Sequence, residues 1–131
     1  MNSHMIAGIG TDIVDVHRIE TKISTNASFK EHVYSATEIA YCDKQKRPFI
    51  HYAARWAVKE AYLKAYGVKF IGNHRLHEIE TLNNEDGKPQ VNLVGKAKEE
   101  FLQKNYEHIH VSISHTDTHA IAYVIIETTT M

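Results

Sequence analysis

Two carboxylates and one lysine are the residues of this sequence best suited to phosphate chemistry. Glu60 and Lys64 lie four residues apart and would share one edge of a helix. Asp12 follows the apolar stretch 5–10, which contains two glycines. A carboxylate beside a lysine can hold a metal ion and a phosphate, but the same spacing also fits an ordinary Glu–Lys helix pair. Asp12 likewise fits a turn or cap residue, so the local sequence leaves both interpretations open.

Two other motif classes receive little support. Gly8 and Gly10 lack the third glycine that a dinucleotide-binding turn needs at the start of a helix, and the sequence has no Walker-type loop. The stretch 112–115, Ser-Ile-Ser-His, contains residue types found in hydrolases. However, no glycine-flanked turn holds either serine as a nucleophile. We therefore interpret this stretch as the polar face of a strand followed by a turn histidine.

The histidine content raises the question of zinc, since the chain has ten histidines. Each of three pairs is spaced so that it could share a metal ion: His74/His77, His108/His110 and His115/His119. No cysteine cluster and no His-Glu-x-x-His helix accompanies them. Zinc is therefore the less favoured interpretation.

Composition indicates one globular domain. The chain has 131 residues, of which 43% are hydrophobic and 24% charged, which is enough to support its own core. A net charge of −1 gives no argument for nucleic acid or membrane partners. Cys42 is the single cysteine and the N-terminus has no signal-peptide pattern, so we expect a cytoplasmic protein. We expect residues 1–4 to be a cloning remnant, 5–127 to form the domain and 128–131 to fray.

Helical patterns fill the first half of the chain. A helix is predicted from residue 15 onward, broken at 26–28, and a short one at 29–34. Ser35 and Glu38 have the spacing of a capping box that begins the next helix. The strongest prediction is a helix over 48–66, with Pro48 in its first turn and Gly67 after its end.

The second half changes to strand periodicity. Strands are predicted over 77–82, 90–94, 108–114 and 120–127, with a turn-rich segment at 83–89 and a helix at 95–105. The last strand is apolar on both faces, which predicts a central position in its sheet or a subunit contact. The expected fold class is α+β, with helices packed on an antiparallel sheet in a single domain.

The helix predicted over 48–66 has two distinct faces. Small residues occupy one arc and would let this helix lie close to its sheet: Ala54, Ala57, Val58, Ala61 and Ala65. Glu60 and Lys64 share one edge of that arc, and Arg55 and Lys59 share the opposite edge.

Four segments, taken together, resemble the holo-acyl-carrier-protein synthase family, the small bacterial phosphopantetheinyl transferases. They are Gly-Ile-Gly-Thr-Asp-Ile-Val at 8–14, Ala-Arg-Trp-Ala-Val-Lys-Glu-Ala-Tyr-Leu-Lys-Ala at 54–65, Gly-Lys-Pro-Gln-Val-Asn-Leu-Val-Gly at 87–95 and Val-Ser-Ile-Ser-His at 111–115. Their order and spacing match the family over nearly all of 5–127. The resemblance implies the 4′-phosphopantetheinyl transferase fold.

The resemblance also implies the reaction. A serine hydroxyl of an acyl carrier protein attacks the β-phosphate of coenzyme A, phosphopantetheine is transferred, and adenosine 3′,5′-bisphosphate leaves. Asp12 and Glu60 match the family's Mg²⁺ ligands, and Asp12, Glu60 and Lys64 would form the catalytic group. The proton acceptor is either Glu60 or a metal-bound water, and the sequence does not choose between them.

Further residues take roles only through the resemblance. Lys64 matches a contact to the pyrophosphate, and Arg55 and His115 match coenzyme A contacts. The basic connector of Lys44, Lys46 and Arg47 could meet the 3′-phosphate, although a solvated connector is as good an interpretation. Arg18 and Lys22 lie on the helix that receives the carrier protein in the family, where an ordinary solvated face is the alternative. The family forms homotrimers with active sites between subunits.

Departures from the family pattern are confined to the coenzyme pocket. Val-Lys-Phe-Ile-Gly at 68–72 stands where the family often has Thr-Gly, and Leu76-His77 stands where it commonly has tryptophan. Two other functions use the same residues: a Mg²⁺-dependent phosphohydrolase, and a non-catalytic module that binds coenzyme A. The expected function remains phosphopantetheine transfer that supports fatty acid biosynthesis.

Overall fold

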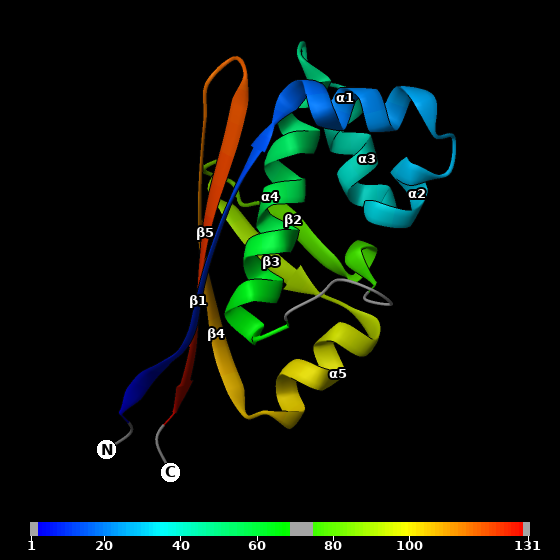
Figure 1. Cartoon of the computed structure of the whole chain (residues 1–131). Coiled ribbons are helices and arrows are strands. Elements are labelled where there is room, and N and C mark those ends of the chain that lie inside the picture. The colour runs from blue at the N-terminus through cyan, green and yellow to red at the C-terminus, as the bar shows by residue number, and fades with distance from the viewer. Residues whose placement is uncertain (1–2, 69–74, 130–131) are drawn as a thin grey trace.

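The computed structural model describes residues 3–68 and 75–129 (Figure 1). Its largest sheet has the order β1-β5-β4, with both neighbouring pairs antiparallel. The strands are β1 (His4–Asp15), β4 (Tyr106–His115) and β5 (His119–Thr129). The central position predicted for the last strand is therefore confirmed, because β5 has a paired strand on each side.

A second, smaller sheet pairs β2 (Ile79–Asn83) with β3 (Pro89–Leu93). The turn between them contains Gly87, whose φ of +80° is a conformation that glycine adopts without strain. The strand expected over 77–82 starts later than predicted, because residues Leu76–Glu78 form the 3₁₀ turn η1. The one antiparallel sheet of the sequence prediction is thus two separate sheets.

Local signals explain where several helices begin. Asp15 accepts a hydrogen bond from the His17 N–H and caps α1 (Val16–Thr25). The predicted capping box is confirmed, since Ser35 and Glu38 exchange side-chain and backbone hydrogen bonds at the start of α3 (Ala36–Asp43). The shorter α2 (Phe29–Val33) and the late α5 (Gly95–Gln103) also lie where the sequence predicts helices.

The central element is α4 (Pro48–Tyr66), which stops at Gly67 as predicted, and Gly67 adopts the left-handed conformation. It packs along one face of the three-stranded sheet, against β1 and β5 (Figure 1). Gly8 and Gly10 make this close approach possible. A Cβ atom would lie 1.8 Å from the Ala65 carbonyl oxygen at Gly8, and 1.9 Å from that of Ala61 at Gly10. The predicted arc of small residues on α4 is buried, and it faces these glycines.

One buried ion pair ties three elements together. The Lys59 ammonium on α4 donates to Glu38 Oε1 at 2.6 Å, and both side chains are fully buried. The same ammonium donates to the carbonyls of Leu76 and Ile79 at 3.0 and 2.7 Å. Glu38 also accepts the Thr81 N–H at 3.0 Å. Lys59 is therefore an internal anchor for α3, α4 and β2, rather than a residue on a helix edge.

The two ends of the described chain meet in the sheet. His4 is paired with Thr129, and Met5 with Thr128. Thr128 and Thr129 therefore belong to β5. The prediction that the tail frays from residue 128 onward is wrong for these two residues, because cross-strand pairing orders them. No helix within 3–68 and 75–129 is long and apolar enough to cross a membrane.

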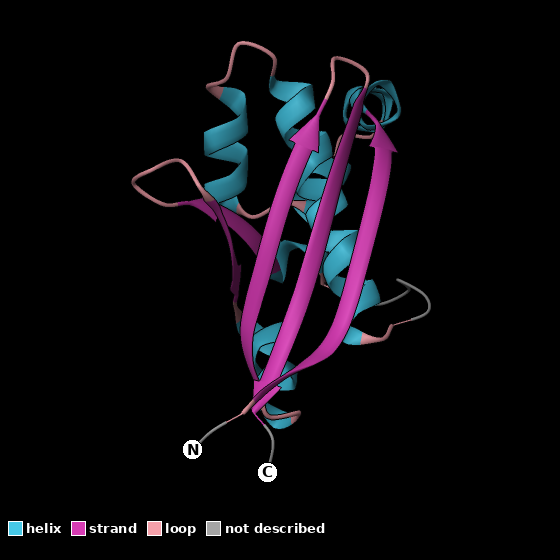
Figure 2. Ribbon diagram, turned by 90° about the vertical axis from the view of Figure 1, so that its left-hand side faces the viewer, coloured by secondary structure: helices cyan, strands magenta, loops and turns pink. Residues whose placement is uncertain are grey.

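In the described residues, no helix covers the sheet face opposite α4 (Figure 2), and the part of this face formed by β1 and β5 is rich in apolar side chains. Ile9, Ile13 and Tyr123 are 61%, 63% and 51% exposed on it. Ile9 lies beside Ile125 and Ile13 beside Ile121 in the strand register, so the apolar side chains form adjacent rows. An exposed apolar face of this kind marks an interaction surface.

Candidate active site

Two of the predicted catalytic residues, Asp12 and Lys64, lie side by side where β1 crosses α4. The Lys64 ammonium lies 2.9 Å from the Thr11 carbonyl oxygen and 3.4 Å from Asp12 Oδ1. Among the ion pairs of the described chain, Lys64 is thus joined to a strand carboxylate rather than to Glu60 one turn away. An ordinary helix pair would join Lys64 to Glu60. The hydrogen-bond partners of Lys64 instead belong to β1, so that interpretation is wrong for this lysine.

Asp12 and Glu60 form an acid pair on which burial has a larger effect than the nearby positive charges. Burial raises the pKa of Asp12, although Lys64 partly offsets this effect. Burial also raises the pKa of Glu60, and the Asp12 charge raises it further. Each carboxylate therefore favours its neutral form more than an ordinary carboxylate does. A bound cation would relieve this, and carboxylate oxygens are the ligand type that Mg²⁺ prefers.

Arg18 of α1 belongs to the same electrostatic neighbourhood. Its charge lowers the pKa of both Asp12 and Glu60, opposing the effect of burial. Lys22, one turn further along α1, instead lies over the ring of Phe29 with its ammonium 5.8 Å from the ring centroid. The two residues predicted for carrier docking therefore differ, because only Arg18 acts on the acid pair.

A second polar group surrounds Arg55 on another part of α4. The guanidinium is buried, lies 4.2 Å over the ring of Tyr41 and donates to Asn83 Oδ1 at 2.9 Å. Asn83 in turn donates to the Gly87 carbonyl, so Arg55 is held against the β2–β3 turn. Its Nε is buried without a hydrogen-bond partner. Such an orphaned donor is costly unless another acceptor reaches it.

His51, which was not among the residues predicted from the sequence, lies within the electrostatic range of both Arg55 and His115. Burial lowers the pKa of His51, and the charges of Arg55 and His115 lower it further. His51 precedes Arg55 by four residues on α4, which is the available sequence signal. Arg55 carries the fixed positive charge of this group, and the two imidazoles can offer N–H donors to a phosphate group.

The basic connector between α3 and α4 is only partly free. Arg47 donates to Asp117 Oδ1 at 2.6 Å and so contacts the β4–β5 turn. Lys44 and Lys46 are exposed. The connector therefore presents its lysines to solvent, while its arginine is paired within the chain.

The predicted residues thus separate into two groups along α4. One contains Asp12, Glu60, Lys64 and Arg18, and the other contains Arg55, His51 and His115. Of the disfavoured zinc pair His74/His77, His74 lies outside the described residues, as do residues 69–72 of the departure from the family pattern. Two carboxylates beside Lys64 and Arg18, with a separate group around Arg55, are residue types suited to transfer at a phosphate ester.

Comparison with known proteins gives the family. The model of the 4′-phosphopantetheinyl transferase superfamily matches residues 8–124. The chain belongs to this superfamily, and within it to the holo-[acyl-carrier-protein] synthases. It is therefore a phosphopantetheinyl transferase.

Relatives resemble the chain over almost its whole length. The holo-[acyl-carrier-protein] synthase of Syntrophus aciditrophicus is 42% identical over 94% of this chain and 97% of its own. The acyl carrier protein synthase of Plasmodium yoelii with ADP bound is 32% identical and has a TM-score of 0.87. The match covers 96% of this chain and 98% of the Plasmodium chain. The Bacillus anthracis holo-(acyl-carrier-protein) synthase in complex with CoA is 32% identical, with a TM-score of 0.77 over 95% of this chain and 98% of that one.

Proposed function

We propose that this protein transfers 4′-phosphopantetheine from coenzyme A to a serine of apo-acyl carrier protein, requires Mg²⁺, and releases adenosine 3′,5′-bisphosphate. The observation that carries the proposal is the acid pair of Asp12 and Glu60, in which burial raises both pKa values beside Lys64. The names of the relatives support the carrier protein as acceptor, and the Bacillus anthracis complex supports coenzyme A as donor.

The acid pair is suited to hold the metal ion. Asp12 and Glu60 would supply carboxylate oxygens, and bound Mg²⁺ would neutralise negative charge on the pyrophosphate of the donor. Lys64 donates to the Thr11 carbonyl, which would hold its ammonium beside Asp12 before substrate arrives. A preoriented cation stabilises charge that develops on the phosphate oxygens during transfer.

The second group would bind the rest of the coenzyme. Arg55 and His115 are proposed contacts to coenzyme A, and Lys44 and Arg47 are proposed contacts to its 3′-phosphate. Arg47 would have to release Asp117 to bind that phosphate. The unpartnered Nε of Arg55 is a donor that an incoming acceptor could satisfy. Arg18 and Lys22 on α1 remain the proposed docking residues for the acidic carrier protein.

Assembly as a homotrimer would complete the site. We propose that the uncovered sheet face with Ile9, Ile13 and Tyr123 forms the subunit contact, because its apolar rows would otherwise stay in water. Sites between subunits would bring the acid pair of one chain to the coenzyme contacts of another. The proposed setting is fatty acid biosynthesis in the cytoplasm.

One experiment separates the proposed function from its alternatives. The protein is incubated with coenzyme A, Mg²⁺ and apo-carrier protein, and the carrier is weighed by mass spectrometry. Transfer adds one phosphopantetheine mass, and a chelator abolishes the gain. Phosphate release without any carrier would indicate the phosphohydrolase instead. Binding of coenzyme A that survives Glu60→Gln, with no mass gain under any metal condition, would indicate a binding module and overturn the proposal.

A further inference from the structure

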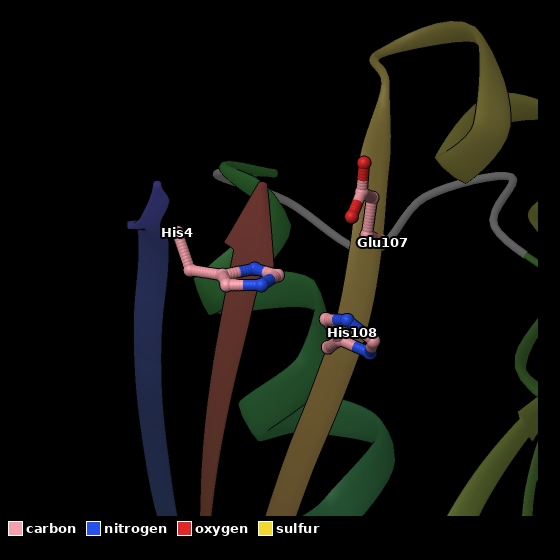
Figure 3. A group of neighbouring side chains, drawn as sticks. All are labelled: His4, Glu107 and His108. Carbon is pink, nitrogen blue, oxygen red and sulfur yellow. The ribbon is translucent and has the colours of Figure 1, made fainter. Parts of the chain in front are cut away.

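A group of potential metal ligands lies at the end of the three-stranded sheet where the two ends of the described chain meet (Figure 3). It consists of His4 from β1 and of Glu107 and His108 from β4. One ligand atom of each side chain lies within 4.8 Å of the others, and all three side chains are exposed. The rings of His4 and His108 are 5.3 Å apart, measured between centroids. The group spans β5, which lies between the two strands in the sheet.

A β-bulge explains why Glu107 belongs to this group. In a regular strand, neighbouring side chains point to opposite faces of the sheet. The pairing of β4 with β5 skips residue 107, passing from Tyr106 opposite Thr128 to His108 opposite Glu127. Such an irregularity redirects the side chain of the extra residue. The bulge therefore lets Glu107 and His108 bring ligand atoms close together, although they are adjacent in sequence.

A second carboxylate–imidazole pair adjoins the group. His110 Nε2 and Glu127 Oε1 are 2.5 Å apart. The pKa of Glu127 is lowered chiefly by its hydrogen bond with His110, and the charges of His4 and His108 lower it further. This carboxylate therefore lies in the field of three imidazoles. Glu127 thus adds a further acidic side chain beside the two histidines of the group.

We propose that this chain binds one Zn²⁺ or a similar transition-metal ion through one ring nitrogen of His4, one of His108 and one oxygen of Glu107. Two imidazoles and a carboxylate suit Zn²⁺, Ni²⁺ or Cu²⁺, whereas Mg²⁺ prefers oxygen ligands alone. Three protein ligands leave a fourth position of the tetrahedron open to water.

This site is separate from the acid pair of the transferase. His4 and Asp12 are eight residues apart on β1, which corresponds to about 26 Å at about 3.3 Å per residue. The bound ion would clip the end of β1 to β4 across β5. Metal binding should therefore stabilise the folded chain by mass action without requiring coenzyme A or carrier protein.

Isothermal titration of metal-depleted full-length protein with Zn²⁺ tests the proposal. We expect one ion per chain. His108→Ala and Glu107→Gln should each raise Kd at least about tenfold, on the scale of lost metal-site interactions. The matched control is His17→Ala, which removes an exposed histidine of α1 and should leave Kd unchanged. Unchanged affinity in His108→Ala, or an equal loss in His17→Ala, would overturn the site.

His4 needs its own variant because it belongs to the segment expected to be a cloning remnant. His4→Ala should raise Kd at least about tenfold if three ligands hold the ion. Equal affinity would contradict the three-ligand site. Glu60→Gln should leave Zn²⁺ binding intact, and loss of binding in that variant would move the metal to the acid pair. These outcomes are independent of phosphopantetheine transfer, so the two proposals fail separately.

Discussion

Replacing Lys59 by methionine should destabilise the protein far more than an ordinary lysine substitution. Lys59→Met leaves the Glu38 carboxylate buried without a counter-charge, and it deprives the carbonyls of Leu76 and Ile79 of their donor. Breaking a buried ion pair by removing one partner costs about 3–5 kcal/mol. Domains of this size are stable by about 5–15 kcal/mol, so the loss is a large fraction of the total.

Lys30 provides the matched control. It pairs with Asp43 Oδ1 at 3.0 Å, but the two side chains are 31% and 48% exposed. Exposed pairs contribute about 0–1 kcal/mol, so Lys30→Met should have a small effect. The same chemical change is thus made once inside the protein and once at its surface.

Urea denaturation at one fixed protein concentration measures the difference. The free energy of unfolding should fall by about 3–5 kcal/mol for Lys59→Met and by less than about 1 kcal/mol for Lys30→Met. In Glu38→Gln/Lys59→Met, the amide can still accept the Thr81 N–H without leaving a buried charge. This double variant should lose less than the two single losses added together. A Lys59→Met loss no larger than that of Lys30→Met would refute the structural argument.

Three further substitutions test other parts of the structure. Gly10→Ala should lower the free energy of unfolding by about 2 kcal/mol or more in urea denaturation, because its Cβ would lie 1.9 Å from the Ala61 carbonyl oxygen; an unaffected midpoint would contradict the close packing. The pKa of Glu60 is raised above its ordinary value of 4.5 in the folded protein. The carboxyl therefore contributes stability to the folded state below pH 4.5, and this contribution is lost as pH rises through the folded-state pKa. Glu60→Gln should therefore stabilise the metal-free protein at pH 7 by a few tenths of a kcal/mol after solvent screening, and the gain should vanish below that ordinary value. A gain that persists in acid would point to another cause. Arg47→Ala should change stability by less than about 1 kcal/mol, since its pair with Asp117 is exposed, and thermal melting checks this.

Features set by neighbouring residues could be predicted from the sequence. Pro48 and Gly67 define both ends of α4, and Ser35 and Glu38 define the start of α3. These signals act within one helical turn, so they need no tertiary information. The alternation along β4 and the doubly apolar β5 were equally readable, because side chains repeat every two residues in a strand.

Features that depend on distant partners could not be predicted in the same way. Lys59 is indistinguishable from a helix-edge lysine until its partner Glu38, 21 residues away, is placed beside it. Lys64 has an acidic neighbour one turn away, yet it pairs with Asp12 because β1 crosses the helix there. The bulge at Glu107 is likewise invisible in the sequence, and it brings Glu107 and His108 together with His4 as potential metal ligands.

We propose that Asp12 and Glu60 together hold the Mg²⁺ used in phosphopantetheine transfer. The most direct measurement is the transfer rate as a function of Mg²⁺ concentration for the unaltered protein, Asp12→Asn and Glu60→Gln, each shown to be folded by circular dichroism. We predict that both variants lose at least about 100-fold in turnover, the scale on which losing charge stabilisation in a transition state acts. Near-normal turnover with an unchanged Mg²⁺ dependence in either variant would contradict the assignment.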